Sequence, residues 1–200
     1  MDVRKYFDSI DHITLKNLLS LLIKDKNTYD LFSVIIEKSD GYNCKGIPIG
    51  NLTSQFFANH YLSCFDHYIK EQCHVKRYIR YMDDMLIFSN NKNELKNLYS
   101  EAVDYIENRL KLQLKPQISG SNSFGAPFLG FLIKPTGIYL QQKTKKRYKA
   151  KVSEIEYKRK TGILSEAEAG SRSESVTSHL LLARARNFRN TVLSGRILGI

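Results

Sequence analysis

Two adjacent aspartates, Asp83 and Asp84, are the residues of this chain best suited to chemistry. They lie between two short runs rich in β-branched and aromatic residues, 75–80 and 85–88, which predict a β-hairpin with the aspartates at its turn. Neighbouring carboxylates repel each other, so such a turn is favoured when a cation lies between them. Mg²⁺ fits well, because it takes one or two carboxylates and completes its shell with water and phosphate oxygens. A solvated Asp-Asp turn is the structural alternative.

A third carboxylate, Asp2, occurs in the segment MDVRKYFDSIDH (residues 1–12). The segment GIPIGNLTSQ (residues 46–55) lies between it and the tetrad YMDD (residues 81–84). These three segments resemble three consecutive palm motifs of reverse transcriptases, and they occur in the same order. A given tetrapeptide arises by chance in about one of a thousand chains of this size, so three ordered matches argue against coincidence.

The resemblance implies an α+β fold, with an antiparallel palm sheet backed by helices and a small C-terminal helical thumb. It also implies RNA-directed DNA synthesis by two-metal phosphoryl transfer, with two Mg²⁺ ions or with Mn²⁺ in their place. Asp2, Asp83 and Asp84 are then the expected catalytic residues and, together with the carbonyl of Val3, the expected metal ligands. Positioning and charge stabilisation carry such a reaction, so no nucleophilic serine or catalytic histidine is needed.

The same resemblance assigns a nucleotide site. Phe7 occupies the position where the family has an aromatic ring that collides with a 2′-hydroxyl, although a core aromatic is the structural alternative. The family often has a lysine beyond the proline that follows Lys115, where it is proposed to protonate the leaving pyrophosphate. These positions hold Ile118 and Ser119 here, so the role either falls to Lys115 or is absent.

Ile49, Gly50 and Gln55, from the second motif, complete the expected nucleotide-binding residues. Many reverse transcriptases have glutamine where this chain has Ile49 and proline where it has Gln55. The departure is similar to the variant found in diversity-generating retroelements. An aliphatic group in place of an amide removes hydrogen bonds to the nucleotide, which predicts lower selectivity and is consistent with error-prone copying of template adenines.

Composition places the chain among basic globular proteins. Its 200 residues, 42% of them hydrophobic, suffice for one core, or for a core with a small appendage. No apolar run long enough to span a membrane and no signal-type stretch occurs, and the three cysteines lack metal-type spacing, so a cytoplasmic protein is expected. The family resemblance implies a bacterial or phage gene. The net charge of +11 is concentrated in residues 141–200, where 14 Lys and Arg face 5 Asp and Glu. This segment is typical of a nucleic-acid binder, with a solvated basic helix as the alternative.

The expected organisation is a palm domain at residues 1–142 and a basic helical thumb at 143–200. The family's fingers region, which precedes the Asp2 motif, is expected to be missing. Periodicity and turn signals predict helices at 14–23, 29–38, 52–72, 93–112 and 175–192, loops around Asp40–Asn43 and at 161–172, and strands at 128–133 and 138–140.

The hairpin formed by these last two strands resembles the primer grip of the family, so Phe128, Leu129 and Gly130 are expected to contact the primer. Further primer–template contacts are assigned by the resemblance to Tyr81, Met82, Lys145, Lys146, Arg147 and Arg186. Basic side chains on phosphates hold register without reading sequence.

The function implied is addition of deoxynucleotides to a primer 3′-end along a template RNA, in a diversity-generating retroelement. The expected partners are the template RNA, a DNA or RNA primer and deoxynucleoside triphosphates, with a small accessory protein as a further candidate. One alternative is a truncated fragment that binds nucleic acid without polymerising, because nothing clamps the triphosphate. Another is a reverse transcriptase of a group II intron, a retron or a phage-defence system.

Overall fold

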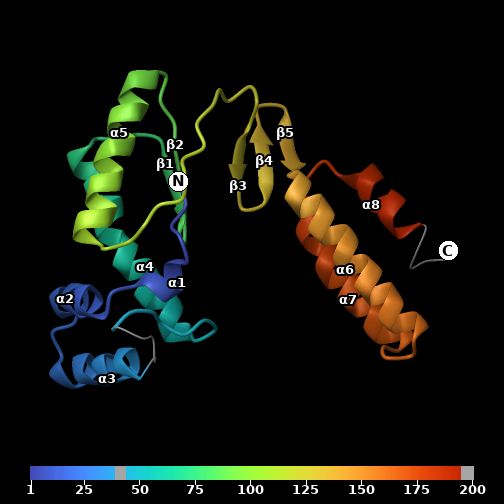
Figure 1. The fold of residues 1–200 in the computed structure, drawn as a ribbon, viewed down its shortest axis with the longest axis horizontal. Coiled ribbons are helices and arrows are strands. Elements are labelled where there is room, and N and C mark those ends of the chain that lie inside the picture. The colour runs from blue at the N-terminus through green and yellow to red at the C-terminus, as the bar shows by residue number, and fades with distance from the viewer. Residues whose placement is uncertain (39–43, 195–200) are drawn as a thin grey trace. The chain divides into compact units, whose positions relative to one another are not determined.

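The structure, a computed structural model, describes residues 1–38 and 44–194 and divides into two compact units, Met1–Ile118 and Ser119–Ile200 (Figure 1). The fold is α+β, as expected, with a small antiparallel sheet in each unit. The predicted loop at Asp40, Gly41 and Asn43 lies outside the described residues. Among the helices that the structure describes, none combines the length and the apolar character needed to cross a bilayer.

The first unit is built around α4 (Leu52–His67), which continues as the π-helical turn η1 (Tyr68–Gln72). Phe57, Tyr61 and Phe65 recur every four positions on α4 and are fully buried, as one face of a helix requires. The other helices of this unit are α1 (Tyr6–Ser9), α2 (His12–Leu22), α3 (Lys26–Glu37) and α5 (Lys92–Asp104), and α5 ends in the π-helical turn η2 (Tyr105–Arg109). Tyr61 ties α4 to the end of η2, because its hydroxyl donates to the carbonyl of Leu110 at 2.7 Å.

Side-chain caps explain why two helices begin earlier than predicted. The carboxylates of Asp11 and Asp25 accept hydrogen bonds from the backbone N–H groups of Thr14 and Thr28, which fixes the first turns of α2 and α3. Hydrophobic periodicity starts only after such a cap, so it places the helix start too late.

The hairpin strands are β1 (Tyr78–Tyr81) and β2 (Asp84–Ile87). The prediction that a strand begins at residue 75 is wrong, because the N–H of Val75 donates to Ile69 and closes the end of η1. The predicted helix at 93–112 is shorter than expected, because Lys111 adopts a positive φ of 53° and the chain leaves the helix there.

The second unit holds a three-stranded antiparallel sheet of β3 (Ala126–Phe128), β4 (Phe131–Lys134) and β5 (Gly137–Leu140). The single strand predicted at 128–133 is wrong. Leu129 and Gly130 have φ angles of 50° and 81°, so they form a two-residue turn that pairs Phe128 with Phe131. Positive φ at both turn positions suits the right-handed twist of the flanking strands.

Helices α6 (Gln142–Lys160), α7 (Glu166–Ser178) and α8 (Arg186–Leu193) follow the sheet, with a 3₁₀ turn at His179–Leu182. The predicted loop at 161–172 is wrong in its second half, because Ser165 and Glu168 form a reciprocal capping box that starts α7. The predicted helix at 175–192 is interrupted: the N–H of Arg184 donates to the carbonyl of Ile138 at 2.8 Å. A long-range backbone bond to β5 therefore outweighs local helix propensity.

The hairpin expected to belong to the palm shares a core with the basic helices. Phe131 and Leu140 from β4 and β5 pack with Tyr148 and Val152 of α6 and with Leu180. The division of the fold between Ile118 and Ser119 therefore precedes the boundary expected at residue 142.

Candidate active site

The turn between β1 and β2 presents the paired aspartates. Tyr81 pairs with Asp84, so Met82 and Asp83 form a two-residue turn. Met82 has a φ of 54°, the left-handed conformation that such a turn needs at its first position. Asp84 is the first residue of β2, and Asp83 lies at the tip of the hairpin. Tyr81 and Met82 were both predicted to contact the primer–template. Tyr81 is 61% exposed, whereas Met82 packs against the core, so only Tyr81 is widely open to solvent.

The start of the chain pairs with this hairpin. Met1 and Met85 exchange two hydrogen bonds, of 2.7 and 2.9 Å, and Asp2 forms an antiparallel bridge with Asp84. On its other side, fully buried Val3 forms a bridge with Leu114. The structure thus brings Asp2 next to the turn that holds Asp83 and Asp84, as the three-motif resemblance implies.

The carboxylates of this cluster influence one another. Burial, together with the charges of Asp2 and Asp84, raises the pKa of Asp83, and the Lys115 ammonium partly opposes this shift. Lys115 also donates to Oδ2 of Asp2 at 2.6 Å, while its backbone N–H bonds the Asp2 carbonyl at 2.8 Å. The second carboxylate oxygen of Asp2, Oδ1, is buried and has no hydrogen-bond partner among the described residues.

This donor set fits a hard divalent cation. A nearby positive charge would stabilise the buried Oδ1 of Asp2, which lacks a partner among the described residues. It would also favour the ionised form of Asp83, whose pKa is raised. In this conformation, the described residues contain no group of three or more acidic, histidine or cysteine side chains arranged to hold a metal ion. The Lys115 ammonium supplies the positive charge instead.

The second motif is bound to the first by backbone hydrogen bonds. Gly46 donates to the carbonyl of Ile10 at 2.8 Å, and Ile47 donates to the carbonyl of Phe7 at 2.9 Å. A Cβ on Gly46, which has a φ of 91°, would lie 3.3 Å from the Asp8 carbonyl oxygen, so the glycine permits this close approach.

The predicted nucleotide residues divide between core and surface. Phe7 is half-buried, packs edge-on to Tyr6 and lies against the core of the first unit. Ile49 is 77% exposed, and Gly50 and Gln55 are also exposed beside the start of α4. That helix begins after Asn51, which makes no side-chain cap, so the amide groups of its first turn are not bonded by that side chain.

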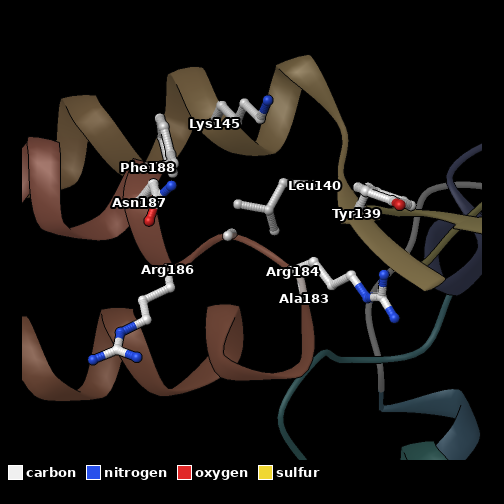
Figure 2. A pocket seen from close by; sticks show the side chains of 9 residues that line it. Tyr139, Leu140, Lys145, Ala183, Arg184, Arg186, Asn187 and Phe188 are labelled. Atoms are coloured by element: carbon white, nitrogen blue, oxygen red, sulfur yellow. The ribbon is translucent and has the colours of Figure 1, made fainter. Parts of the chain in front are cut away.

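A separate cavity of about 360 Å³ lies within the second unit (Figure 2). Leu140 is among the residues that line it, and Lys145 extends from α6 on one side (Figure 2). Arg184 lies beside Tyr139, whereas Arg186 extends in the opposite direction (Figure 2). The cavity combines an apolar lining with cationic side chains, an arrangement suited to a polyanion that also presents sugar or base surfaces.

The remaining predicted primer–template residues lie nearby in the same unit. Lys146 and Arg147 are exposed on α6 and do not line the cavity. Phe128 lies at the end of β3, and the Leu129–Gly130 turn is held by Thr144, whose hydroxyl donates to the Gly130 carbonyl at 2.6 Å. Arg184 also lines the cavity but was not among the predicted site residues, since the continuous helix predicted there gives no signal for its bond to β5.

Comparison with known proteins agrees with this geometry. The model of the family described as reverse transcriptase (RNA-dependent DNA polymerase) matches residues 1–131, which include all three carboxylates. No curated protein gives a significant match to the chain. The match covers more than half of the chain, and the protein therefore belongs to the reverse transcriptase family.

Proposed function

We propose that the chain adds deoxynucleotides to a primer 3′-end along a template RNA, using Asp2, Asp83 and Asp84 as its catalytic carboxylates. The observation that carries this proposal is the antiparallel bridge between Asp2 and Asp84 at the turn that holds Asp83. A solvated Asp-Asp turn does not require a third carboxylate at the same place.

The three carboxylates would hold two Mg²⁺ ions, with the Val3 carbonyl as a further ligand. Divalent ions at such a site supply charge neutralisation for the triphosphate and lower the pKa of the primer 3′-hydroxyl. The contribution of the chain is to fix the carboxylates: the Asp2 backbone is bonded to Lys115, and Asp84 is the first residue of a paired strand. Lys115 lies close enough to exchange its bond with Asp2 for one with an incoming phosphate.

Phe7, Ile49, Gly50 and Gln55 form the proposed nucleotide side. The ring of Phe7 would exclude a 2′-hydroxyl by its shape. Exposed Ile49 offers the nucleotide an apolar contact where a glutamine would offer hydrogen bonds, which supports low selectivity and membership of the diversity-generating type. An Ile49→Gln variant should therefore misincorporate less opposite template adenines, and an unchanged error spectrum would exclude Ile49 as the cause.

The second unit is the proposed thumb and primer grip. Its cavity and the exposed cations Lys146 and Arg147 would hold the phosphate backbone of the primer–template duplex. Binding of this kind weakens steeply with salt, because each neutralised phosphate releases counterions.

Primer extension on an RNA template with Mg²⁺ tests the proposal. We expect incorporation by the wild-type chain, loss of incorporation in Asp83→Ala, and no loss in Asp30→Ala, which removes an exposed carboxylate on α3. Duplex binding without incorporation would support the rival fragment that binds but does not polymerise. The genomic neighbourhood tests the retroelement type: we expect a nearby near-duplicate of a coding segment that differs at adenines, and a gene for a small accessory protein. The absence of the near-duplicate would favour an intron, retron or phage-defence enzyme.

A further inference from the structure

Arg80, the residue before the YMDD tetrad, makes a charge pair with α4. Its Nε donates to Oδ1 of Asp66 at 2.7 Å and its Nη2 donates to Oδ2 at 2.5 Å, so the two planar groups meet in a two-pronged contact. The side chain of Arg80 is 11% exposed and that of Asp66 is 29% exposed. The hydroxyl of Tyr78 donates to the same Asp66 oxygen at 2.8 Å, which fixes the orientation of the carboxylate.

The same guanidinium holds the catalytic turn. Its Nη1 donates to the backbone carbonyl of Met82 at 3.0 Å and also reaches Oδ1 of Asn59 at 3.3 Å. Met82 has the left-handed φ of 54°, a conformation that a non-glycine residue adopts only when its surroundings enforce it. Asp83 follows Met82 directly, so the bond to the Met82 carbonyl fixes the peptide plane from which Asp83 extends.

The ionic partner of Arg80 is Asp66. Hydrogen bonds and the charge of Asp66 outweigh the effect of burial and raise the pKa of Arg80. The bond from Arg80 to the Met82 carbonyl places Arg80 to influence Asp83 through geometry.

We propose that Arg80 is a positioning residue that connects α4 to the catalytic turn and holds Asp83 in place. This inference rests on the proposed function for its catalytic consequence, but the restraint on the turn is measurable without polymerisation. α4 begins at the second motif, so one guanidinium would link the helix beside the nucleotide site to the turn that carries the carboxylates.

The test must separate positioning from general stability. Removing one partner leaves the other half-buried charge unpaired, whereas replacing both by apolar groups is often neutral for stability. The informative variant is therefore the double substitution Arg80→Met/Asp66→Leu. Arg80→Lys keeps the charge but loses the planar fork, and Arg77→Met is the matched control, because Arg77 is exposed on the segment leading into β1.

Hydrogen–deuterium exchange of residues 78–87 is the first measurement, with urea unfolding of the same samples. We expect the double variant to exchange at the turn roughly 10-fold faster while its unfolding midpoint stays near that of the wild type. Arg80→Lys should also exchange faster, and Arg77→Met should match the wild type. Wild-type exchange at the turn in the double variant would overturn the proposal, whether or not the chain polymerises.

Primer-extension kinetics are the second measurement. Displacement of Asp83 predicts a kcat about 10- to 100-fold lower in the double variant, with little change in the KM for the nucleotide. If the wild-type chain does not extend the primer, the proposed function is contradicted. The hydrogen–deuterium exchange measurement then decides the role of Arg80 by itself. An active wild type with full kcat in the double variant would refute the catalytic consequence.

Discussion

Replacing Lys115 by methionine should strengthen the binding of divalent cations at the carboxylate cluster. The ammonium of Lys115 lies 2.6 Å from Oδ2 of Asp2. A cation that uses this oxygen must first displace the ammonium, and a second positive charge nearby also opposes the approach of an ion. Methionine keeps most of the side-chain length and removes both effects.

The size of the effect follows from the exposure of the pair. The side chains of Lys115 and Asp2 are 47% and 35% exposed, so solvent screens their attraction. A partly exposed ion pair contributes about 0.5–1 kcal/mol of stabilisation. Removing the Lys115 ammonium as a competitor for Asp2 therefore corresponds to roughly 2- to 5-fold tighter cation binding. Screening by salt should reduce the difference between wild type and variant.

Titration with Mn²⁺, followed by electron paramagnetic resonance, measures the affinity directly. Lys111→Met is the matched control, because Lys111 pairs with Asp11 at 3.1 Å and its side chain is 49% exposed, but it lies outside the carboxylate cluster. We expect this control to bind Mn²⁺ like the wild type. Equal or weaker binding by Lys115→Met would refute the competition; loss of primer extension without a change in affinity would instead favour proton donation by Lys115.

Three further predictions concern stability. Leu129→Asn should stabilise the chain by about 0.5–1 kcal/mol, because asparagine tolerates the left-handed φ of 50° better than leucine does. Burial alone would raise the pKa of Asp11, but hydrogen bonds from Thr14 and the Lys111 ammonium outweigh it and lower that pKa below its ordinary value of 3.8. The stability conferred by ionised Asp11 is therefore complete when the pH is above the ordinary pKa, and it is lost as the pH falls through the lower pKa of the folded chain. Asp11→Asn should accordingly lose less stability on acidification than the wild type does. Tyr6→Phe should cost about 1 kcal/mol, because the buried hydroxyl donates to an α4 carbonyl 2.5 Å away.

Urea unfolding midpoints check all three, against substitutions of the same chemistry at exposed positions. Leu181→Asn, Asp30→Asn and Tyr157→Phe are these controls, and each should change the midpoint little. A destabilised Leu129→Asn, an acid response of Asp11→Asn equal to that of the wild type, or an unchanged Tyr6→Phe would each contradict the corresponding argument.

The hairpin that carries Asp83 and Asp84 was predictable because its signals are local. Paired carboxylates between two strand-like runs predict a hairpin, and Asp83 and Asp84 do lie at one. The α+β class was implied by the family resemblance. The helix at 52–72 followed from local signals, and the buried face of α4 repeats with the period of a helix. The meeting of Asp2 with this hairpin came from the family resemblance, because no local pattern specifies a pairing over such a sequence distance.

The second unit was harder to predict because long-range contacts override local preference there. Residues 128–133 are apolar enough for one strand, but the positive φ values of Leu129 and Gly130 fold them into two. Leu181 and Leu182, in the continuous helix predicted at 175–192, are 62% and 70% exposed, because the chain turns at Ala183 to reach β5.

Arg80 shows why a motif alone does not describe a site. Its position beside the tetrad suggests an exposed strand residue, and nothing in the spacing of the sequence connects it to Asp66, which lies fourteen positions earlier. The connection depends on the fold: α4 must pack so that Asp66 faces β1, and only then can one guanidinium reach both that carboxylate and the Met82 carbonyl. A chain that kept the three motifs but lost this contact would retain all three proposed catalytic carboxylates and lose a restraint on where one of them points.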